Sequence, residues 1–185
     1  MVYPKILVVG ENAIKPMTIG GGSSSLKGQR EISPLEGIRA RAHREAEVQF
    51  VRGYVGAPNT AQDGMVGIDL TDNRSADQLR EEAVKAAREA DVVIFVGGLN
   101  KEGHQDCEGV DRLSYEFPYG QNELIEALAE ANERTVVVLV SGNAVAMPWL
   151  PRVAAVVEAW YSGSETGNAL ADVLFGDISQ IVRCL

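Results

Sequence analysis

Polar side chains of the kinds used in catalysis are concentrated in one nine-residue segment, HQDCEGVDR, at positions 104–112. It comes soon after an apolar run, DVVIFV, which has the composition of a buried strand. A carboxyl on a loop beyond such a strand can be partly desolvated, which raises its pKa toward neutrality and suits it to general acid/base catalysis. Glu108 precedes Gly109, which permits a tight backbone, so this segment is the first candidate for a catalytic carboxyl.

The same segment allows two other interpretations. His104, Asp106 and Glu108 alternate along the chain and could ligate a metal ion. The sequence has no second cluster of ligands to complete a coordination sphere, so we expect no metal, and no cofactor is implied. Asp111 and Arg112 could pair to fix the loop, or could form an ordinary surface ion pair.

A glycine- and serine-rich segment, GGGSSS at positions 20–25, could bind a phosphate through its backbone N–H groups. It lies ten residues beyond the first predicted strand and lacks both the G-x-G-x-x-G spacing and the lysine of a phosphate-binding loop. The alternative is a loop that folds over a neighbouring domain, which is the commoner role of such segments.

Serines also follow two later apolar runs, in SGN at positions 141–143 and SGSETG at positions 162–167. No histidine follows His104, so a serine hydrolase triad with the chain order of α/β-hydrolases is not expected, and these serines are predicted to cap helices. Three aromatic side chains could stack on a sugar, or pack in the core or a domain interface: Trp149, Trp160 and Tyr161.

The elements that would position these residues alternate between strands and helices. Apolar runs predict strands at 5–9, 47–51, 91–96, 135–140 and 153–160, and helical periodicity predicts helices at 34–44, 76–90, 120–132 and 164–175. Ser33 before Pro34 is an N-cap signal, and Asn73 or Ser75 caps the second helix. This alternation predicts an α/β fold: a three-layer α/β sandwich with a mostly parallel sheet, helices on both faces and flavodoxin-like layering.

Loops that follow the strands leave the carboxyl edge of the predicted sheet, where α/β folds bind their ligands. The segments at 11–33 and 97–118 are long enough to suggest that they serve a site. The segment at 53–74 is rich in Gly, Asn, Asp and Thr and predicts a surface loop tolerant of change.

Composition excludes several classes of function. The 185 residues are 45% hydrophobic, enough for a buried core, and the net charge of −9 with scattered lysines and arginines argues against a nucleic-acid partner. Cys107 and Cys184 form no metal or disulfide pattern. No apolar run is long enough to span a membrane and the first residues lead directly into a strand, so we expect neither a membrane segment nor a signal peptide, and localisation stays open.

Four segments, in order, resemble the C-terminal α/β-sandwich domain of glycoside hydrolase family 3, which includes β-glucosidases. They are MTIGGGSSSLKG with SPLEGI, ADVVIFVGGLNKEGHQDCEGVDRLSYEFPYGQNELI, TVVVLVSGNAVAMPW, and AWYSGSETGNALADVLFGD. The resemblance covers nearly the whole chain and implies a single domain at 1–185. It also implies a (β/α)8 barrel, in cis or in trans, that carries an aspartate nucleophile and is absent here.

The resemblance further implies retaining hydrolysis of a β-linked glucoside or oligosaccharide, with the acid/base supplied by this domain. Glu108 matches the glutamate of the family pattern E-G-x-D-R and is the expected acid/base, with Glu102 as the alternative. Other side chains would shape the loop or contact the sugar: His104, Asp106, Asp111, Arg112, Met17, Gly21 and Ser23.

Departures from the family pattern leave other functions open. After VLFGD the family continues with N-P-S-G-K-L-P and a closing strand, whereas this chain reads ISQIVRCL, which predicts a truncated end. The resemblance implies that full-length relatives are periplasmic or secreted. A non-catalytic carbohydrate-binding or interaction module is the alternative function, and a flavodoxin-like nucleotide binder that uses the glycine-rich loop is a further one.

Overall fold

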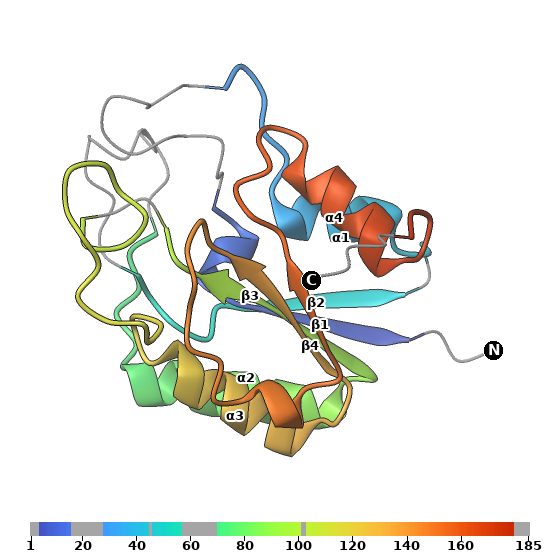
Figure 1. The fold of residues 1–185 in the computed structure, drawn as a ribbon. Coiled ribbons are helices and arrows are strands. Elements are labelled where there is room, and N and C mark those ends of the chain that lie inside the picture. Colours follow the sequence, from blue (N-terminus) through green and yellow to red (C-terminus); the bar gives the residue numbers. More distant parts are fainter. Residues whose placement is uncertain (1–3, 16–27, 45, 57–69, 101–102, 180–185) are drawn as a thin grey trace.

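The computed structural model describes residues 4–15, 28–44, 46–56, 70–100 and 103–179. Within them the chain forms a parallel sheet with the strand order β2-β1-β3-β4-β5, shown in Figure 1. The strands are β1 (Lys5–Val9), β2 (Glu47–Val51), β3 (Val92–Gly98), β4 (Thr135–Val140) and β5 (Ala155–Glu158). This order is the doubly wound order of flavodoxin-like folds, so the predicted class is confirmed.

Helices cover both faces of the sheet (Figure 1). The helices α1 (Pro34–Arg41) and α4 (Thr166–Leu174) pack on one face, and α2 (Ala76–Glu89) and α3 (Gln121–Ala131) on the other. Alternate side chains of β1 enter opposite cores, with Ile6 packed toward α1 and Leu7 toward α2. Because the central strands are buried on both faces, nearly all of their residues are apolar, as in TVVVLV of β4.

Two helices begin at the serines with the strongest sequence signals. The side chains of Ser33 and Ser75 each accept a hydrogen bond from the backbone N–H three residues on. In turn, the side chains of Glu36 and Gln78 accept one from the backbone N–H of the capping serine. Ser75, and not Asn73, therefore caps α2. The other serine caps are wrong, because α4 begins after Glu165 without a side-chain cap.

The two remaining serine segments bond locally. The Ser141 hydroxyl donates to the Asn143 carbonyl, and the Ser162 hydroxyl donates to the Ala159 carbonyl. Both contacts close tight turns directly after β4 and β5, so these serines shape the carboxyl edge of the sheet.

The two tryptophans have different surroundings. Trp149 precedes the short helix η4 (Leu150–Arg152), is fully buried in the core, and donates its indole N–H to the Asn122 side chain at 2.9 Å. Trp160 is 60% exposed just after β5, with a φ of 52°. Core packing thus accounts for Trp149, while Trp160 lies at the surface. No helix in the described residues is long and apolar enough to cross a membrane.

The segment predicted as a tolerant surface loop, 53–74, is anchored at both described ends. Tyr54 is buried in the core, and Asp72 pairs with the buried Arg52. The surface-loop prediction is therefore wrong at the first end, where Gly53 and Tyr54 are buried, whereas Thr71, Asn73 and Arg74 at the other end are exposed. Residues 57–69 lie outside the described part of the chain.

Candidate functional site at the carboxyl edge of the sheet

The loop between β3 and α3 carries the predicted catalytic segment. Residues 99–100 and 103–120 of it are described, and we call these residues the β3–α3 loop. Its first turn closes on the end of β3, because the Asp106 amide donates to the Asn100 carbonyl at 2.9 Å. Positive φ values at His104 (63°) and Gly109 (90°) reverse the chain on either side of the central residues. The loop therefore has a defined path past Glu108.

The Asp106 carboxylate accepts three hydrogen bonds from other elements. Its Oδ2 accepts from the Gly142 amide at 2.6 Å and from the Tyr161 hydroxyl at 2.7 Å, and its Oδ1 accepts from the Asn143 side-chain amide. Gly142 and Asn143 follow β4, and Tyr161 follows β5. One side chain thus joins the loop after β3 to the turns after the next two strands.

Arg112 attaches the same loop at a second point. Its guanidinium donates to the Ala144 carbonyl at 2.5 Å and the Ser114 carbonyl at 2.8 Å, and it lies 5.8 Å from the ring centre of Tyr115. The pair with Asp111 that the sequence suggested is not formed, because the guanidinium is directed to these carbonyls instead. The carbonyl of Asp111 meets Nδ1 of His104 at 3.1 Å.

A cavity of about 710 Å³ lies between the β3–α3 loop and the turns after β4 and β5. Its lining is Gln105, Asp106, Cys107, Val110, Asp111, Arg112, Leu113, Ser114, Tyr115, Gly142, Asn143, Ala144 and Tyr161. Glu108 is exposed, and its neighbour Cys107, whose thiol contacts the Glu108 carbonyl at 3.3 Å, lines the cavity. The structure therefore places Glu108 beside a concave surface that holds both polar and aromatic groups.

Two groups at or near the cavity, Tyr161 in its lining and Glu158 at the end of β5, have shifted pKa values. Burial raises the pKa of the Tyr161 hydroxyl far above its usual value, and the hydrogen bond to Asp106 raises it further. Partial burial also raises the pKa of Glu158, and the nearby Asp106 charge adds to this shift against two backbone hydrogen bonds. Tyr161 therefore keeps its proton, and remains a donor to Asp106, throughout the pH range in which carboxyl groups titrate.

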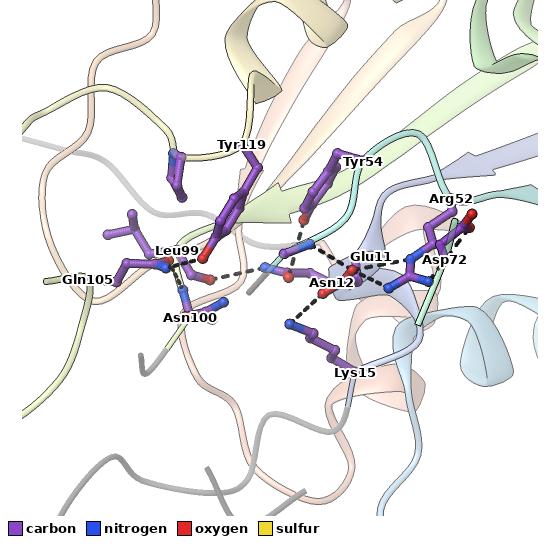
Figure 2. A network of polar contacts seen from close by, with 12 residues as sticks. Glu11, Asn12, Lys15, Arg52, Tyr54, Asp72, Leu99, Asn100, Gln105 and Tyr119 are labelled. Atoms are coloured by element: carbon purple, nitrogen blue, oxygen red, sulfur yellow. Dashed lines mark hydrogen bonds and ion pairs between the residues drawn. The ribbon is translucent and has the colours of Figure 1, made fainter. Parts of the chain in front are cut away.

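A second set of contacts holds the β3–α3 loop from inside (Figure 2). Oε1 of Gln105 accepts from the Asn100 amide at 3.0 Å, and its Nε2 donates to the Tyr119 hydroxyl at 2.9 Å. The Tyr119 ring stacks on Tyr54 with the planes 6° apart, and the Tyr54 hydroxyl donates to Asn12 at 3.2 Å. Gln105 thereby links the beginning and the end of the loop to residues that follow β1 and β2.

This chain of contacts leads to a buried charge cluster at the end of β1 (Figure 2). Glu11, in the short helix η1 (Glu11–Ala13), is 1% exposed and lies 2.5 Å from Nζ of Lys15 and 2.6 Å from Nη2 of Arg52. Its Oε2 also accepts from the Gly56 amide at 2.8 Å. Sequence reasoning missed this cluster; the glutamate and lysine four residues apart, immediately after a buried strand, are the signal that could have suggested it.

The structure accounts for the predicted site residues only in part. His104, Asp106, Glu108, Asp111 and Arg112 all lie on the β3–α3 loop, as expected. Four other predicted residues lie outside the described part of the chain: Met17, Gly21, Ser23 and Glu102. So do the last residues of the predicted truncated end, 180–185, which include Cys184. Within the described residues, no three His, Cys, Asp or Glu side chains gather as a metal site would require.

Comparison with known families identifies the group of proteins to which this chain belongs. The sequence matches the glycosyl hydrolase family 3 C-terminal domain over residues 3–183. The chain belongs to this family. It is 51% identical over 178 residues to Beta-glucosidase BoGH3A of Bacteroides ovatus, and 37% identical over 174 residues to thermostable beta-glucosidase B of Acetivibrio thermocellus.

Those matches cover nearly the whole length of this family 3 domain but only a small part of the length of either relative. They cover 96% and 94% of this chain, and 23% and 21% of the two β-glucosidases. The chain therefore spans less than a quarter of the length of these curated relatives.

Solved structures agree with the family 3 assignment. The GH3 β-glucosidase of Bifidobacterium adolescentis superposes with a TM-score of 0.72 at 34% identity, over 95% of this chain and 23% of that one. The β-glucosidase of Kluyveromyces marxianus in complex with glucose gives a TM-score of 0.81 at 20% identity, over 95% and 38% of the two chains, and supports the fold alone.

Proposed function

We propose that this family 3 domain supplies Glu108 as the general acid/base of a retaining β-glucosidase-like active site. One observation carries the proposal: Glu108 is exposed beside the cavity at the carboxyl edge, between Asp106 and Arg112, which both attach to the turn after β4. Similarity to β-glucosidases supplies the substrate class, a β-linked glucoside or oligosaccharide. His104 and Asp111, with Met17, Gly21 and Ser23, are proposed to shape the site or contact the sugar.

Retaining hydrolysis requires two carboxyl groups about 5–5.5 Å apart. In the first step a nucleophilic carboxylate attacks the anomeric carbon while the acid gives its proton to the leaving oxygen. In the second step the same group, now a base, takes a proton from the water that cleaves the glycosyl-enzyme. We assign the acid/base role in both steps to Glu108. We propose that the nucleophile lies on a (β/α)8 barrel domain beyond this chain, so the 185 residues alone are expected to give no turnover.

The test places this chain in the context of a full-length enzyme. In a chimera, the 185 residues replace the matching segment of Beta-glucosidase BoGH3A, to which they are 51% identical. The parent chimera should hydrolyse aryl β-glucosides, and Glu108→Gln should lower kcat/KM for an alkyl glucoside by roughly 10²–10⁴-fold because the leaving alkoxide is no longer protonated. A dinitrophenyl glucoside, whose leaving group needs no proton, should retain most of its kcat/KM.

Rescue by a small anion distinguishes an acid/base from a merely structural glutamate. With Glu108→Ala, azide can attack the glycosyl-enzyme without a general base, so it should restore kcat on the dinitrophenyl substrate and yield the β-glycosyl azide. Glu130→Gln, an exposed change on α3, is the matched control and should leave activity intact. If Glu102→Gln shows the losses and the rescue while Glu108→Gln does not, the role belongs to Glu102. Sugar binding without turnover in the parent chimera would favour a carbohydrate-binding module.

A further inference from the structure

We propose that Asp106 is a positioning residue for Glu108, and that it holds the β3–α3 loop instead of binding the sugar. The inference rests on the function proposed for Glu108 and adds a role for a different side chain. Asp106 precedes Glu108 by two residues, so its carboxylate sets the position from which the loop extends past the cavity.

The bonding of the Asp106 carboxylate is the first argument. A carboxylate accepts about four hydrogen bonds. Three of the positions on Asp106 are taken by Gly142, Asn143 and Tyr161, which lie 36, 37 and 55 residues away along the chain. A sugar hydroxyl would have to displace one of these donors or use the single remaining position. The contacts therefore have the form of a clamp between three loops.

Gln105, the residue before Asp106, holds the same stretch of backbone from the opposite side. Gln105 is buried and faces the loop interior, where it contacts Asn100 and Tyr119, whereas Asp106 contacts the turns after β4 and β5. The Asp106 amide is also bonded to the Asn100 carbonyl. Side chain and backbone contacts together fix residues 105 and 106, and leave little freedom to the chain that enters Glu108.

A second attachment lies beyond Glu108. Arg112 donates to the Ala144 carbonyl, in the turn whose Gly142 amide donates to Asp106. Glu108 is therefore carried on a short bridge, residues 107–111, whose two ends rest on one turn. Because a displacement of about 1 Å of a catalytic group can cost about 10²-fold in rate, the stiffness of these ends matters for proton transfer.

The kinetic test uses the same chimera. Asp106→Asn puts an amide N–H₂ where an acceptor oxygen stood, and Tyr161→Phe removes a single donor while keeping the ring. Both should lower kcat/KM for the alkyl glucoside, by about 10–100-fold for Asp106→Asn and less for Tyr161→Phe, and should change kcat/KM for the dinitrophenyl glucoside by less than about 3-fold. Inhibition by glucose should be unchanged. Equal losses on both substrates with weaker glucose inhibition would identify a sugar contact and overturn the proposal.

A measurement on the 185-residue chain itself does not depend on activity. Amide hydrogen exchange across residues 107–111 should accelerate at least about 10-fold in Asp106→Asn and by a smaller factor in Tyr161→Phe, while β3 keeps its protection. Asp77→Asn, an exposed change on α2, should alter neither exchange nor kinetics. If Asp106→Asn does not fold, Tyr161→Phe alone decides the question, and unchanged exchange and leaving-group dependence in it would overturn the proposal.

The two proposals fail in different ways. If Glu108→Gln keeps full activity in the chimera, the acid/base assignment is wrong, but faster exchange in Asp106→Asn still shows that Asp106 holds the loop. If Glu108→Gln loses activity while Asp106→Asn leaves exchange unchanged, only the positioning role is wrong.

Discussion

At the scale of single residues, the β3–α3 loop is held by tyrosines that keep their protons over the pH range in which carboxyl groups titrate. Tyr161 donates to Asp106, and burial keeps its pKa far above its usual value. Tyr54, which contacts the other side of the loop through Tyr119, is also buried and has a raised pKa for the same reason. The two tyrosines therefore hold the loop from opposite sides without titrating near neutral pH.

These pKa shifts predict an alkaline limit to stability. In the unfolded chain a tyrosine has a pKa near 10, and in the folded chain Tyr54 and Tyr161 have higher values. The folded state therefore binds more protons above about pH 10, so their contribution is complete below that pH and falls progressively as the pH rises above it toward the folded pKa values. The free energy of unfolding in urea should fall between about pH 9.5 and 11.5. Tyr161→Phe should reduce the slope; a parallel decline in the variant would exclude Tyr161 as a cause.

At the scale of elements, α1 and α4 approach each other through glycines. A Cβ on Gly37 would lie 1.9 Å from the Gly167 carbonyl oxygen, and a Cβ on Gly167 would lie 2.1 Å from the Ser33 carbonyl oxygen. Both obstructing atoms are backbone, so no side-chain rotation can relieve the overlap. The capped start of α1 is thus fitted directly against the start of α4.

Gly37→Ala should therefore force the two helices apart. We expect a loss of about 3 kcal/mol in the free energy of unfolding, the upper end of the range for overpacked cores, measured by urea denaturation followed by circular dichroism. Gly103→Ala is the matched control because a Cβ there meets nothing within 4 Å, and it should change stability by less than about 0.5 kcal/mol. Similar values for the two variants would mean that the helix contact adapts.

The elements were predictable where local signals are strong. Apolar runs located all the described strands, and Ser33 with Pro34 located α1, because burial and capping act through neighbours in sequence. The start of α4 was missed because SGSETG contains several capping residue types and the structure uses none of their side chains. Helix α1 also ends at Arg41, before the predicted end at 44.

The segment proposed to be catalytic was predictable as a group, but the partners of its members were not. Residue types and family pattern both directed attention to 104–112. Nothing in that segment shows that Asp106 bonds to Gly142 and Tyr161, since those contacts depend on which strands end side by side. The sequence instead suggests Asp111, the nearest charged residue, as the partner of Arg112, whereas the Arg112 guanidinium donates to carbonyls after β4 and within the loop.

At the scale of the whole molecule, the sheet order brings the ends of all its strands into one connected edge. The loops after β3, β4 and β5 meet at Asp106, and the residues after β1 and β2 meet at Glu11. Gln105, Tyr119, Tyr54 and Asn12 connect the two centres (Figure 2). The β3–α3 loop is therefore supported by the whole width of the sheet.

Removing one charge from the Glu11 cluster should accordingly cost far more stability than breaking an exposed ion pair. Glu11→Gln leaves the buried cations of Lys15 and Arg52 facing an uncharged amide, and removing one partner of a buried ion pair typically costs about 3–5 kcal/mol. Glu47→Gln breaks an exposed pair with Lys5 at 4.0 Å and should cost less than about 1 kcal/mol. Urea denaturation of both variants gives the comparison. If the two losses are alike, the cluster tolerates an unbalanced charge by admitting water, and the carboxyl edge cannot owe its rigidity to Glu11.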